Sequence, residues 1–228
     1  MCLFIYGLFG KITPFRVTIR NSAGDSLPKG HLQGTRPFVT ESDQTHPRLA
    51  LRRTVVLVGM MGSGKTAIGR ALSQRLDVPF LDSDAEIETA AHATIAEIFA
   101  RDGEPFFRRR ESEVIARLLT GDPCILSTGG GAFLAKRNRK AIKRHGVAVW
   151  LDAPLDVLWD RVRHKDTRPL LRTPDPFRTL SEIYAARTPV YAKAKLHLSV
   201  RPRASIDETT DGVIDLLLTR PDVLERLS

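Results

Sequence analysis

Short apolar runs alternate with helix-patterned segments along most of this chain. The runs are almost continuously apolar, as strands buried on both faces of a sheet are. Between them, apolar residues recur three and four positions apart, which is typical of amphipathic helices. We predict an α/β fold of three layers, α/β/α, around a five-stranded parallel sheet. The predicted strands are residues 54–58, 79–81, 124–127, 147–151 and 196–200, and the predicted helices are residues 65–76, 95–102, 105–119, 155–162 and 181–192.

The two ends of the chain have different patterns. A last helix is predicted from Ser205, because Ser205-Ile206-Asp207-Glu208 has capping-box spacing, and it ends before Pro221. Residues 1–52 are polar and turn-rich without strand or helix period, so we predict an irregular or disordered N-terminal extension. A transit peptide and a misassigned start codon are alternative interpretations of it. The folded domain is predicted at residues 53–219, followed by a tail at 220–228.

Composition and charge limit the possible number of domains, the class of ligand and the cellular compartment. The 228 residues, 42% of them hydrophobic, suit one globular domain with an extension. A net charge of +9 and a pI near 10.0 suit polyanionic ligands such as nucleotides and acidic metabolites, although solvated surface charge accounts for most of these residues. Cys2 and Cys124 are too few for a disulfide framework, so we expect a reducing cytoplasm and a buried Cys124.

Neither membrane insertion nor secretion is expected. No apolar run approaches the roughly 18 residues that span a bilayer. The first ten residues are apolar, but they lack a basic leading region and a small-residue cleavage site.

The most specific motif is Gly59-Met60-Met61-Gly62-Ser63-Gly64-Lys65-Thr66, between an apolar run and a helix pattern. Its glycines let backbone N–H groups surround a polyphosphate, and the helix N-terminus adds partial positive charge. Lys65 can reach the β- and γ-phosphates, and the Thr66 hydroxyl can ligate Mg²⁺. An ordinary glycine-rich turn is the alternative, but the strand–turn–helix context favours binding of a nucleoside triphosphate.

Two further segments follow predicted strands, where ligands of parallel sheets gather. Asp82 and Asp84 would point to the same side of an extended chain, one toward a metal and phosphate and the other toward an acceptor hydroxyl. Acids at a helix N-terminus are the alternative interpretation. The run Gly129-Gly130-Gly131 leaves its backbone bare, so that a ligand can approach it closely.

Three arginine-bearing segments are candidate anion sites. In Arg108-Arg109-Arg110 successive side chains diverge by about 100°, so at most one or two can face a pocket. Arg168 lies in a loop-like stretch that fits a mobile lid over a transferring phosphoryl group. Arg187 could pair bidentately with a substrate carboxylate.

Together and in this order, these residues resemble the shikimate kinase family of nucleoside-monophosphate-kinase-like P-loop proteins, over roughly residues 53–218. The marks beside the phosphate loop are Leu81-Asp82-Ser83-Asp84, Ile87-Glu88, Ile98-Phe99, Asp102-Gly103-Glu104, Phe107-Arg108, Gly129-Gly130-Gly131, Arg168-Pro169-Leu170-Leu171, and Arg187 ahead of Pro189 and Tyr191.

The resemblance implies ATP-dependent phosphorylation of the 3-hydroxyl of shikimate, on the route to chorismate and the aromatic amino acids. It implies a P-loop kinase core with a substrate-binding segment at about residues 82–111 and a mobile lid at about residues 163–175. A cytoplasmic monomer with ATP and shikimate as partners, and Mg²⁺ as cofactor, is the corresponding expectation.

Residue roles are carried over motif by motif. Asp84 would hold and orient the substrate hydroxyls, while Arg108 and Arg187 bind the carboxylate and the Gly130 and Gly131 backbone supports the substrate. Asp82 would act on Mg²⁺ through water, beside Thr66. Lys65 and Arg168 would neutralise charge on the transferring phosphoryl group, and residues 201–204 fall near the family's adenine loop. The implied ATP-binding residues are Gly62, Ser63, Gly64, Lys65, Thr66, Ala67, Arg161 and Arg168, with Arg161 near the adenine.

Two other functions remain open at the level of sequence. One is a related P-loop kinase of another small hydroxy acid, such as gluconate; the combination of Asp84 with Arg108 and Arg187 favours shikimate. The other is a non-catalytic, nucleotide-dependent protein that binds nucleic acid through its basic surface. The sequence has no recognisable RNA- or DNA-binding module and no aromatic–basic interleaving, so we expect no nucleic-acid partner.

Overall fold

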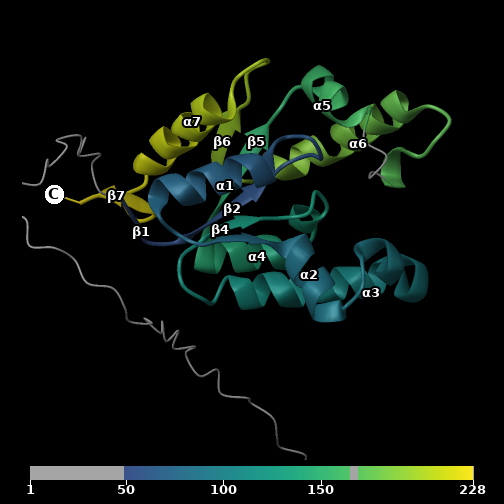
Figure 1. Ribbon diagram of the computed structural model, residues 1–228, viewed down its shortest axis with the longest axis horizontal. Coiled ribbons are helices and arrows are strands. Elements are labelled where there is room, and N and C mark those ends of the chain that lie inside the picture. Colours follow the sequence, from purple (N-terminus) through teal and green to yellow (C-terminus); the bar gives the residue numbers. More distant parts are fainter. Residues whose placement is uncertain (1–48, 165–168, 228) are drawn as a thin grey trace, which may run out of the picture. The chain divides into compact units, whose positions relative to one another are not determined.

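The computed structural model describes residues 49–164 and 169–227. A parallel sheet of five strands forms its centre, in the order β3-β4-β2-β5-β6 (Figure 1). The predicted three-layer α/β/α fold is therefore confirmed. The strands are β2 (Thr54–Val58), β3 (Phe80–Asp82), β4 (Ile125–Ser127), β5 (Gly146–Asp152) and β6 (Leu196–Ser199), each within two residues of its predicted bounds.

The central strand β2 shows why these segments read as continuous apolar runs. Val55 pairs with Ile125 of β4 on one side and with Val147 of β5 on the other, and every residue of β2 is buried. Helices cover both faces of the strand, so neither set of side chains meets water. Cys124 is buried as predicted, directly before β4.

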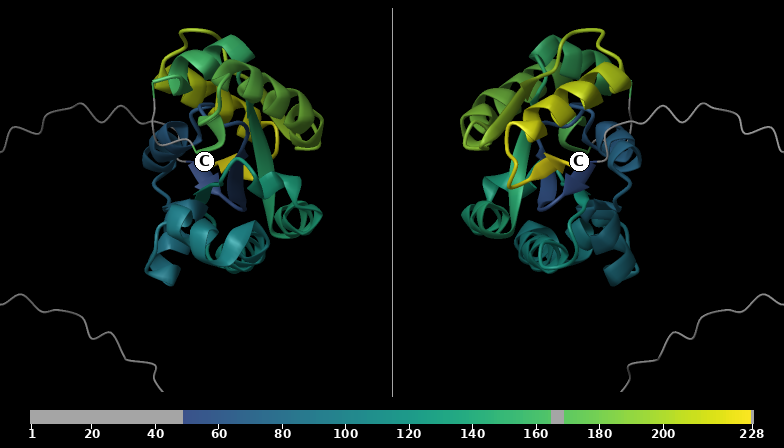
Figure 2. Two further views of the ribbon diagram at one scale, coloured as in Figure 1. Left: turned by 90° about the vertical axis from the view of Figure 1, so that its right-hand side faces the viewer. Right: turned by 90° about the vertical axis from the view of Figure 1, so that its left-hand side faces the viewer.

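Helices form the two outer layers. Helices α1 and α7 contact each other on one side of the sheet, whereas α4 packs against β5 on the other (Figures 1 and 2). Helix α1 turns Ile68, Leu72 and Leu76 inward, four residues apart. The helices are α1 (Lys65–Leu76), α2 (Ser83–Ala91), α3 (Ile95–Leu118), α4 (Lys136–His145), α5 (Leu155–Val162), α6 (Pro176–Tyr191) and α7 (Ile206–Leu218), with 3₁₀ turns η1 (Ala132–Leu134) and η2 (Pro169–Leu171).

Several helix boundaries have a clear local cause. The division predicted between residues 95–102 and 105–119 is confirmed, because α3 consists of two helical segments that meet at Gly103, whose conformation is not helical (φ 79°, ψ 168°). Helix α6 begins five residues earlier than predicted, since Asp175 caps it and Pro176 fits its first turn. The capping box of α7 is confirmed, with Ser205 Oγ accepting from the Glu208 N–H at 3.0 Å.

The expectation of an extended chain at Asp82-Ser83-Asp84 is wrong. Asp82 ends β3 and caps α2, because its Oδ1 accepts a hydrogen bond of 3.0 Å from the Asp84 N–H. Asp84 therefore lies in the first turn of a helix, so the alternative interpretation, acids at a helix N-terminus, is confirmed, although α2 was not among the predicted helices. Helix α4 was not predicted either, since only Asn138 and Ile142 of its ten residues are buried.

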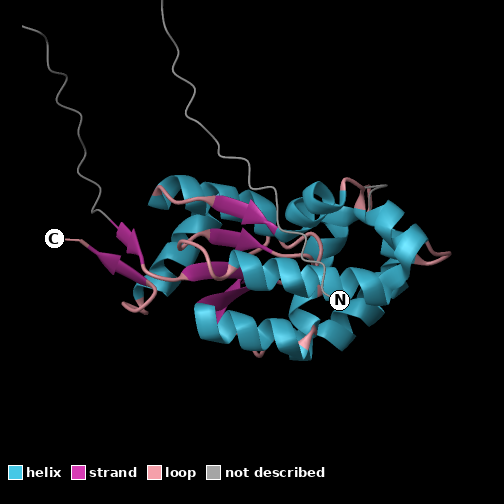
Figure 3. Ribbon diagram, turned by 90° about the horizontal axis from the view of Figure 1, so that it is seen from below, coloured by secondary structure: helices cyan, strands magenta, loops and turns pink. Residues whose placement is uncertain are grey.

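The described residues at both ends of the chain differ from the prediction. Within the predicted irregular extension, β1 (Leu49–Leu51) is a strand, and it pairs antiparallel with β7 (Leu224–Arg226) of the predicted tail. Arg52 reinforces the pair, as its N–H donates to Val223 O at 2.8 Å and its guanidinium donates to Glu225 at 2.5 Å. Figure 3 shows this small sheet beside the end at which the parallel strands begin. The rest of the extension lies outside the described residues.

None of the helices in the described part of the chain is long and apolar enough to cross a membrane.

Candidate active site

A cavity of about 650 Å³ opens where the parallel strands end. It joins the phosphate loop to the segments that follow β3 and β4, as expected for ligand sites in parallel sheets. Its lining residues are Met61, Gly62, Gly64, Lys65, Thr66, Ala67, Ile68, Asp82, Asp84, Ser127, Thr128, Gly129, Gly130, Arg161, Val200, Ala204, Ser205, Ile206 and Thr209.

The phosphate loop wraps around the Lys65 ammonium. Lys65 Nζ donates to Gly59 O at 3.0 Å and to Met60 O at 2.9 Å, and the residue is buried. Gly64 ends the loop in the left-handed conformation (φ 96°) and leads directly into α1. The α1 N-terminus and a lysine thus face one end of the cavity, an arrangement suited to a polyphosphate.

Thr66 and Asp82 bring two hard oxygen ligands together. The Thr66 hydroxyl donates to Asp82 Oδ2 at 3.3 Å, and both residues line the cavity. A hydroxyl and a single carboxylate suit Mg²⁺, which keeps several waters and takes its other ligands from phosphate oxygens. The described residues include no cluster of three or more His, Cys, Asp or Glu side chains that could hold a metal by itself.

Asp84 has the most strongly perturbed carboxylate of the site. Burial, followed by the charge of Asp82, raises the pKa of Asp84 to about 6, while Lys65 opposes the shift. Its Oδ1 is buried without a hydrogen-bond partner among the described residues. A Cβ on Gly129 would lie 2.7 Å from this oxygen, so only glycine leaves room there. Within the described residues, Asp84 Oδ1 is therefore an unpaired hydrogen-bond acceptor beside a glycine backbone, and it could accept a hydrogen bond from a hydroxyl group of a bound ligand.

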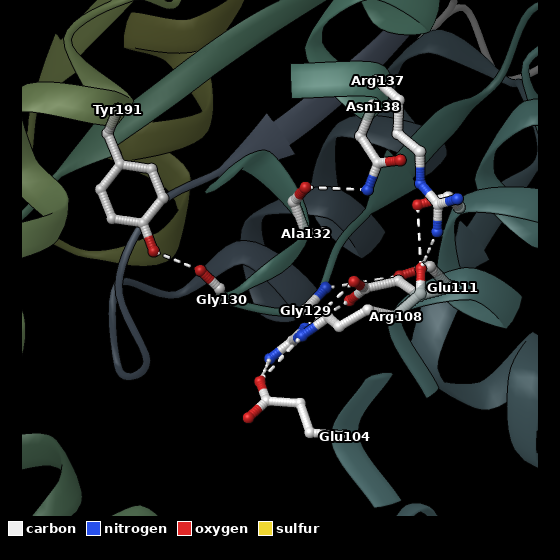
Figure 4. A network of polar contacts seen from close by, with 11 residues as sticks. Glu104, Arg108, Glu111, Gly129, Gly130, Ala132, Arg137, Asn138 and Tyr191 are labelled. Carbon is white, nitrogen blue, oxygen red and sulfur yellow. Dashed lines mark hydrogen bonds and ion pairs between the residues drawn. The ribbon is translucent and has the colours of Figure 1, made fainter. Parts of the chain in front are cut away.

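Hydrogen bonds with surrounding residues hold the glycine run, residues 129–131, and the Ala132 that follows it (Figure 4). The Gly129 N–H donates to Ser83 Oγ at 3.3 Å, and Asn138 Nδ2 donates to Ala132 O at 2.8 Å. The Tyr191 hydroxyl donates to Gly130 O. Burial raises the pKa of Tyr191, so this donor keeps its proton, although the charge of Arg187 opposes the shift. These bonds hold a loop without side chains in one conformation.

Two guanidinium groups lie beside successive glycines. A Cβ on Gly130 would be 3.7 Å from Arg187 Nη1, and a Cβ on Gly131 would be 2.5 Å from Arg108 Nη1. Arg108 is half-buried, whereas Arg109 and Arg110 are exposed, as expected from their divergence on a helix. Arg108 and Arg187 come from α3 and α6, which are far apart in sequence, and they converge next to the cavity without lining it.

Residues of α1, α5 and the segment before α7 also line the cavity. Arg161 Nη1 donates to Gly62 O at 3.2 Å, so this arginine contacts the phosphate loop. Ala204 lines the cavity, whereas Arg201 is exposed. Arg168 lies outside the described residues, as does part of the predicted lid.

Three further residues of the site were given no role in the sequence analysis, although Glu104 and Tyr191 belong to the motifs quoted there. Glu104 and Glu111 both pair with Arg108, and Tyr191 binds the Gly130 carbonyl. A signal was present in the spacing: the glutamates stand four residues before and three residues after Arg108, and Tyr191 stands four residues after Arg187. Residues at these distances are neighbours on a helix.

Comparisons with known proteins agree with this geometry. The family model for shikimate kinases matches residues 61–218. A shikimate kinase of Ruegeria pomeroyi is 66% identical over 176 residues, which are 77% of this chain and 90% of that protein. A shikimate kinase of Cereibacter sphaeroides is 63% identical over 175 residues, 77% of this chain and 87% of that protein.

A solved structure is similar as well. It is a shikimate kinase from Acinetobacter baumannii in complex with shikimate, with a TM-score of 0.70 and 35% sequence identity. The match covers 73% of this chain and 93% of that chain. Sequence, fold and site thus agree, and the chain belongs to the shikimate kinase family.

Proposed function

We propose that this protein transfers the γ-phosphoryl group of ATP to the 3-hydroxyl of shikimate, forming shikimate 3-phosphate and ADP in the route to aromatic amino acids. One observation carries the proposal: a phosphate loop and the half-buried Asp84 carboxylate share one cavity, and two arginines adjoin it at Gly130 and Gly131. The identities of 63% and 66% to shikimate kinases favour this acceptor over gluconate and over a non-catalytic role.

The acceptor side matches a small hydroxylated carboxylic acid. Arg108 and Arg187 bind the carboxylate, since a guanidinium pairs with it through parallel hydrogen bonds. Asp84 accepts hydrogen bonds from the hydroxyls, and the Gly130–Gly131 backbone lies against the ring. A buried acceptor left without a partner is costly, so an analogue that lacks the hydroxyl binds poorly.

The phosphate side supplies charge neutralisation and positioning. Lys65 and Arg168 stabilise negative charge on the transferring phosphoryl group, and Gly62, Ser63, Gly64, Thr66 and Ala67 complete the phosphate cradle with their backbone. The transition state of phosphoryl transfer is loose and requires little early deprotonation, so Asp84 orients the attacking hydroxyl and is not an obligatory base. Arg161 and residues 201–204 surround the adenine.

Thr66 and Asp82 would hold Mg²⁺, Thr66 directly and Asp82 through water. When bound, the cation would neutralise charge on the phosphate groups. We further propose that the protein acts as a cytoplasmic monomer and uses neither nucleic acid nor membrane as a partner.

An ADP-release assay tests this function. The full chain is incubated with ATP, Mg²⁺ and, separately, shikimate, gluconate or a nucleoside monophosphate. Of the three acceptors, we expect only shikimate to give ADP release. A preference for another acceptor, or no turnover with any, would contradict the proposal.

The Lys65→Ala variant provides the matched inactive control for that assay. It should lose at least about 10²-fold in kcat, as when one preorganised charge donor is removed, while its circular dichroism spectrum stays that of the wild type. Turnover like that of the wild type would refute phosphoryl transfer at this loop.

A further inference from the structure

The Arg108 guanidinium is shared by two carboxylates of its own helix (Figure 4). Its Nη1 donates to both carboxylate oxygens of Glu111, at 3.1 and 3.0 Å. Its Nε and Nη2 both donate to Glu104 Oε1, at 3.1 and 3.0 Å.

The two glutamates differ in how firmly they are held. The Glu111 side chain is 1% exposed and that of Glu104 is 62% exposed. Leaving the buried Glu111 without its partner would be costly, so it is a permanent partner of Arg108. Glu104 hydrogen-bonds through its carboxylate to Arg108 only, within the part of the chain that the structure describes, and can return to water. An exposed ion pair of this kind is weak.

The geometry of the guanidinium leaves one edge for an added carboxylate. Nη1 is directed to Glu111, and the plane of the group packs against Gly131, where a Cβ would lie 2.7 Å from Cζ. The Nε and Nη2 donors form the remaining bidentate edge, which matches a carboxylate. Glu104 Oε1 accepts from both of these donors.

We propose that Glu104 is an internal competitor for the carboxylate-binding edge of Arg108 and thereby determines the specificity of the acceptor site. This role rests on the proposed function, in which Arg108 binds the substrate carboxylate. An incoming carboxylate must displace Glu104. A substrate carboxylate that also contacts Arg187 pairs with two cations and can displace Glu104 from Arg108. A small monoanion that contacts Arg108 alone displaces Glu104 less readily and binds more weakly.

The position of Glu104 suits such an exchange. It follows Gly103, where α3 is interrupted, and precedes Pro105. The residue thus begins the second segment of α3, and its carboxylate lies at the surface. A displaced Glu104 side chain can move into solvent by rotation of its own torsions, without unwinding the helix that carries Arg108.

The Glu104→Gln variant tests the role, with Glu113→Gln as matched control. Glu113 is an exposed glutamate of the same helix, paired with Arg110 at 2.7 Å, so its replacement makes the same change in charge. We expect E104Q to lower the KM for shikimate by about two- to fivefold, as expected for loss of an exposed ion pair. The KM for ATP should not change, and E113Q should match the wild type.

An unchanged or higher KM for shikimate in E104Q would overturn the role, and so would an equal decrease in E113Q. Calorimetric titration with benzoate, a monocarboxylate, provides a second measurement that needs no turnover. E104Q should bind benzoate more tightly than the wild type and E113Q; equal binding by all three would also overturn the role. Turnover of shikimate by the wild type tests the proposed function separately, so the two failures can be told apart.

Discussion

At the scale of single residues, the Asp84 carboxylate that we propose to bind the acceptor hydroxyls also lowers the stability of the folded protein at neutral pH. Its pKa of about 6 in the folded protein lies above the ordinary value of 3.8, since burial disfavours the charged form. The folded state therefore binds a proton more tightly than the unfolded state. As the pH rises from about 4 to about 6, ionisation of Asp84 lowers the free energy of unfolding. Above about pH 6 this contribution does not change further.

The Asp84→Asn variant should separate the two effects. Asparagine does not ionise, so unfolding at pH 8 should require about 1–3 kcal/mol more free energy than in the wild type, and this gain should vanish near pH 4. Activity should fall by about 10²-fold or more, because an amide is a weaker acceptor for the hydroxyl. Urea unfolding at both pH values and kcat/KM measure these quantities; a less stable variant at pH 8 would contradict the assignment.

The sequence predicted which charged residues line the cavity better than it predicted the contacts that support them. Lys65 and Asp84 follow strands in recognisable motifs, and both line the cavity. Glu111 and Tyr191 were missed because their roles depend on where α3 and α6 meet the glycine run. Helix spacing places each of them beside an arginine, but it cannot tell a buried pair from a solvated one.

At the scale of elements, the glycine run is a loop that two arginine side chains, one from α3 and one from α6, approach closely because glycine has no side chain. Gly131 has φ −89° and ψ −17°, which any residue adopts, and the three atoms nearest to a Cβ placed there all belong to Arg108. Gly131→Ala should therefore displace the guanidinium and raise the KM for shikimate by about tenfold, equivalent to about 1.4 kcal/mol. The KM for ATP should stay within about twofold.

Gly121→Ala is the control for that variant. Its Cβ would meet only Leu118 O, at 3.8 Å, an ordinary contact. Steady-state kinetics of both variants check the prediction. Equal KM values for shikimate in the two variants would show that the approach of Arg108 to Gly131 does not matter for binding.

Helix α6 places Arg187 beside Gly130, where we propose that it binds the substrate carboxylate. Arg187→Ala should raise the KM for shikimate by roughly 10- to 100-fold, because truncating one member of a charged pair leaves the other unpaired. The effect on the KM for ATP should be much smaller. Arg178→Ala is the control, since Arg178 lies on the same helix, is exposed and pairs with Glu182 at 2.9 Å. Equal effects of R187A on both substrates would argue against a carboxylate ligand.

Elements with an apolar period were predicted well, and those without one were missed. The bounds of α1 and α5 agree with the predicted residues 65–76 and 155–162. Helix α4 is mostly lysine and arginine and buries only two residues, so its pattern resembled that of a loop. Helix α2 was missed because Asp82 and Asp84 were interpreted as an extended pair rather than as a cap and a first turn.

At the scale of the whole molecule, the pair β1–β7 joins the two ends of the described domain. Leu49 and Leu51 pack against the main core, and Leu224 is fully buried. Such pairing over more than 170 residues leaves no local sequence signal, since three-residue strands carry almost no period. The predicted boundary near residue 53 therefore falls after a strand that belongs to the core.

Two truncations test this boundary. Deletion of residues 1–46 should leave kcat and the melting temperature nearly unchanged. Deletion of residues 1–52 removes β1 and the Arg52 bonds, and should lower the free energy of unfolding by about 1–3 kcal/mol. Equal melting temperatures for the two truncations would show that β1 contributes nothing, and loss of folding in the shorter deletion would show that the extension is structural.

The position of the transferred phosphoryl group tests the central claim most directly. Shikimate is incubated with ATP, Mg²⁺ and the full chain, and the product is analysed by ¹H–³¹P correlation NMR. We expect a single product whose phosphorus couples to the proton on carbon 3 of shikimate, because we propose that Asp84 and the two arginines hold the acceptor beside the phosphate loop. Coupling to another carbinol proton, or no phosphorylated product, would contradict it.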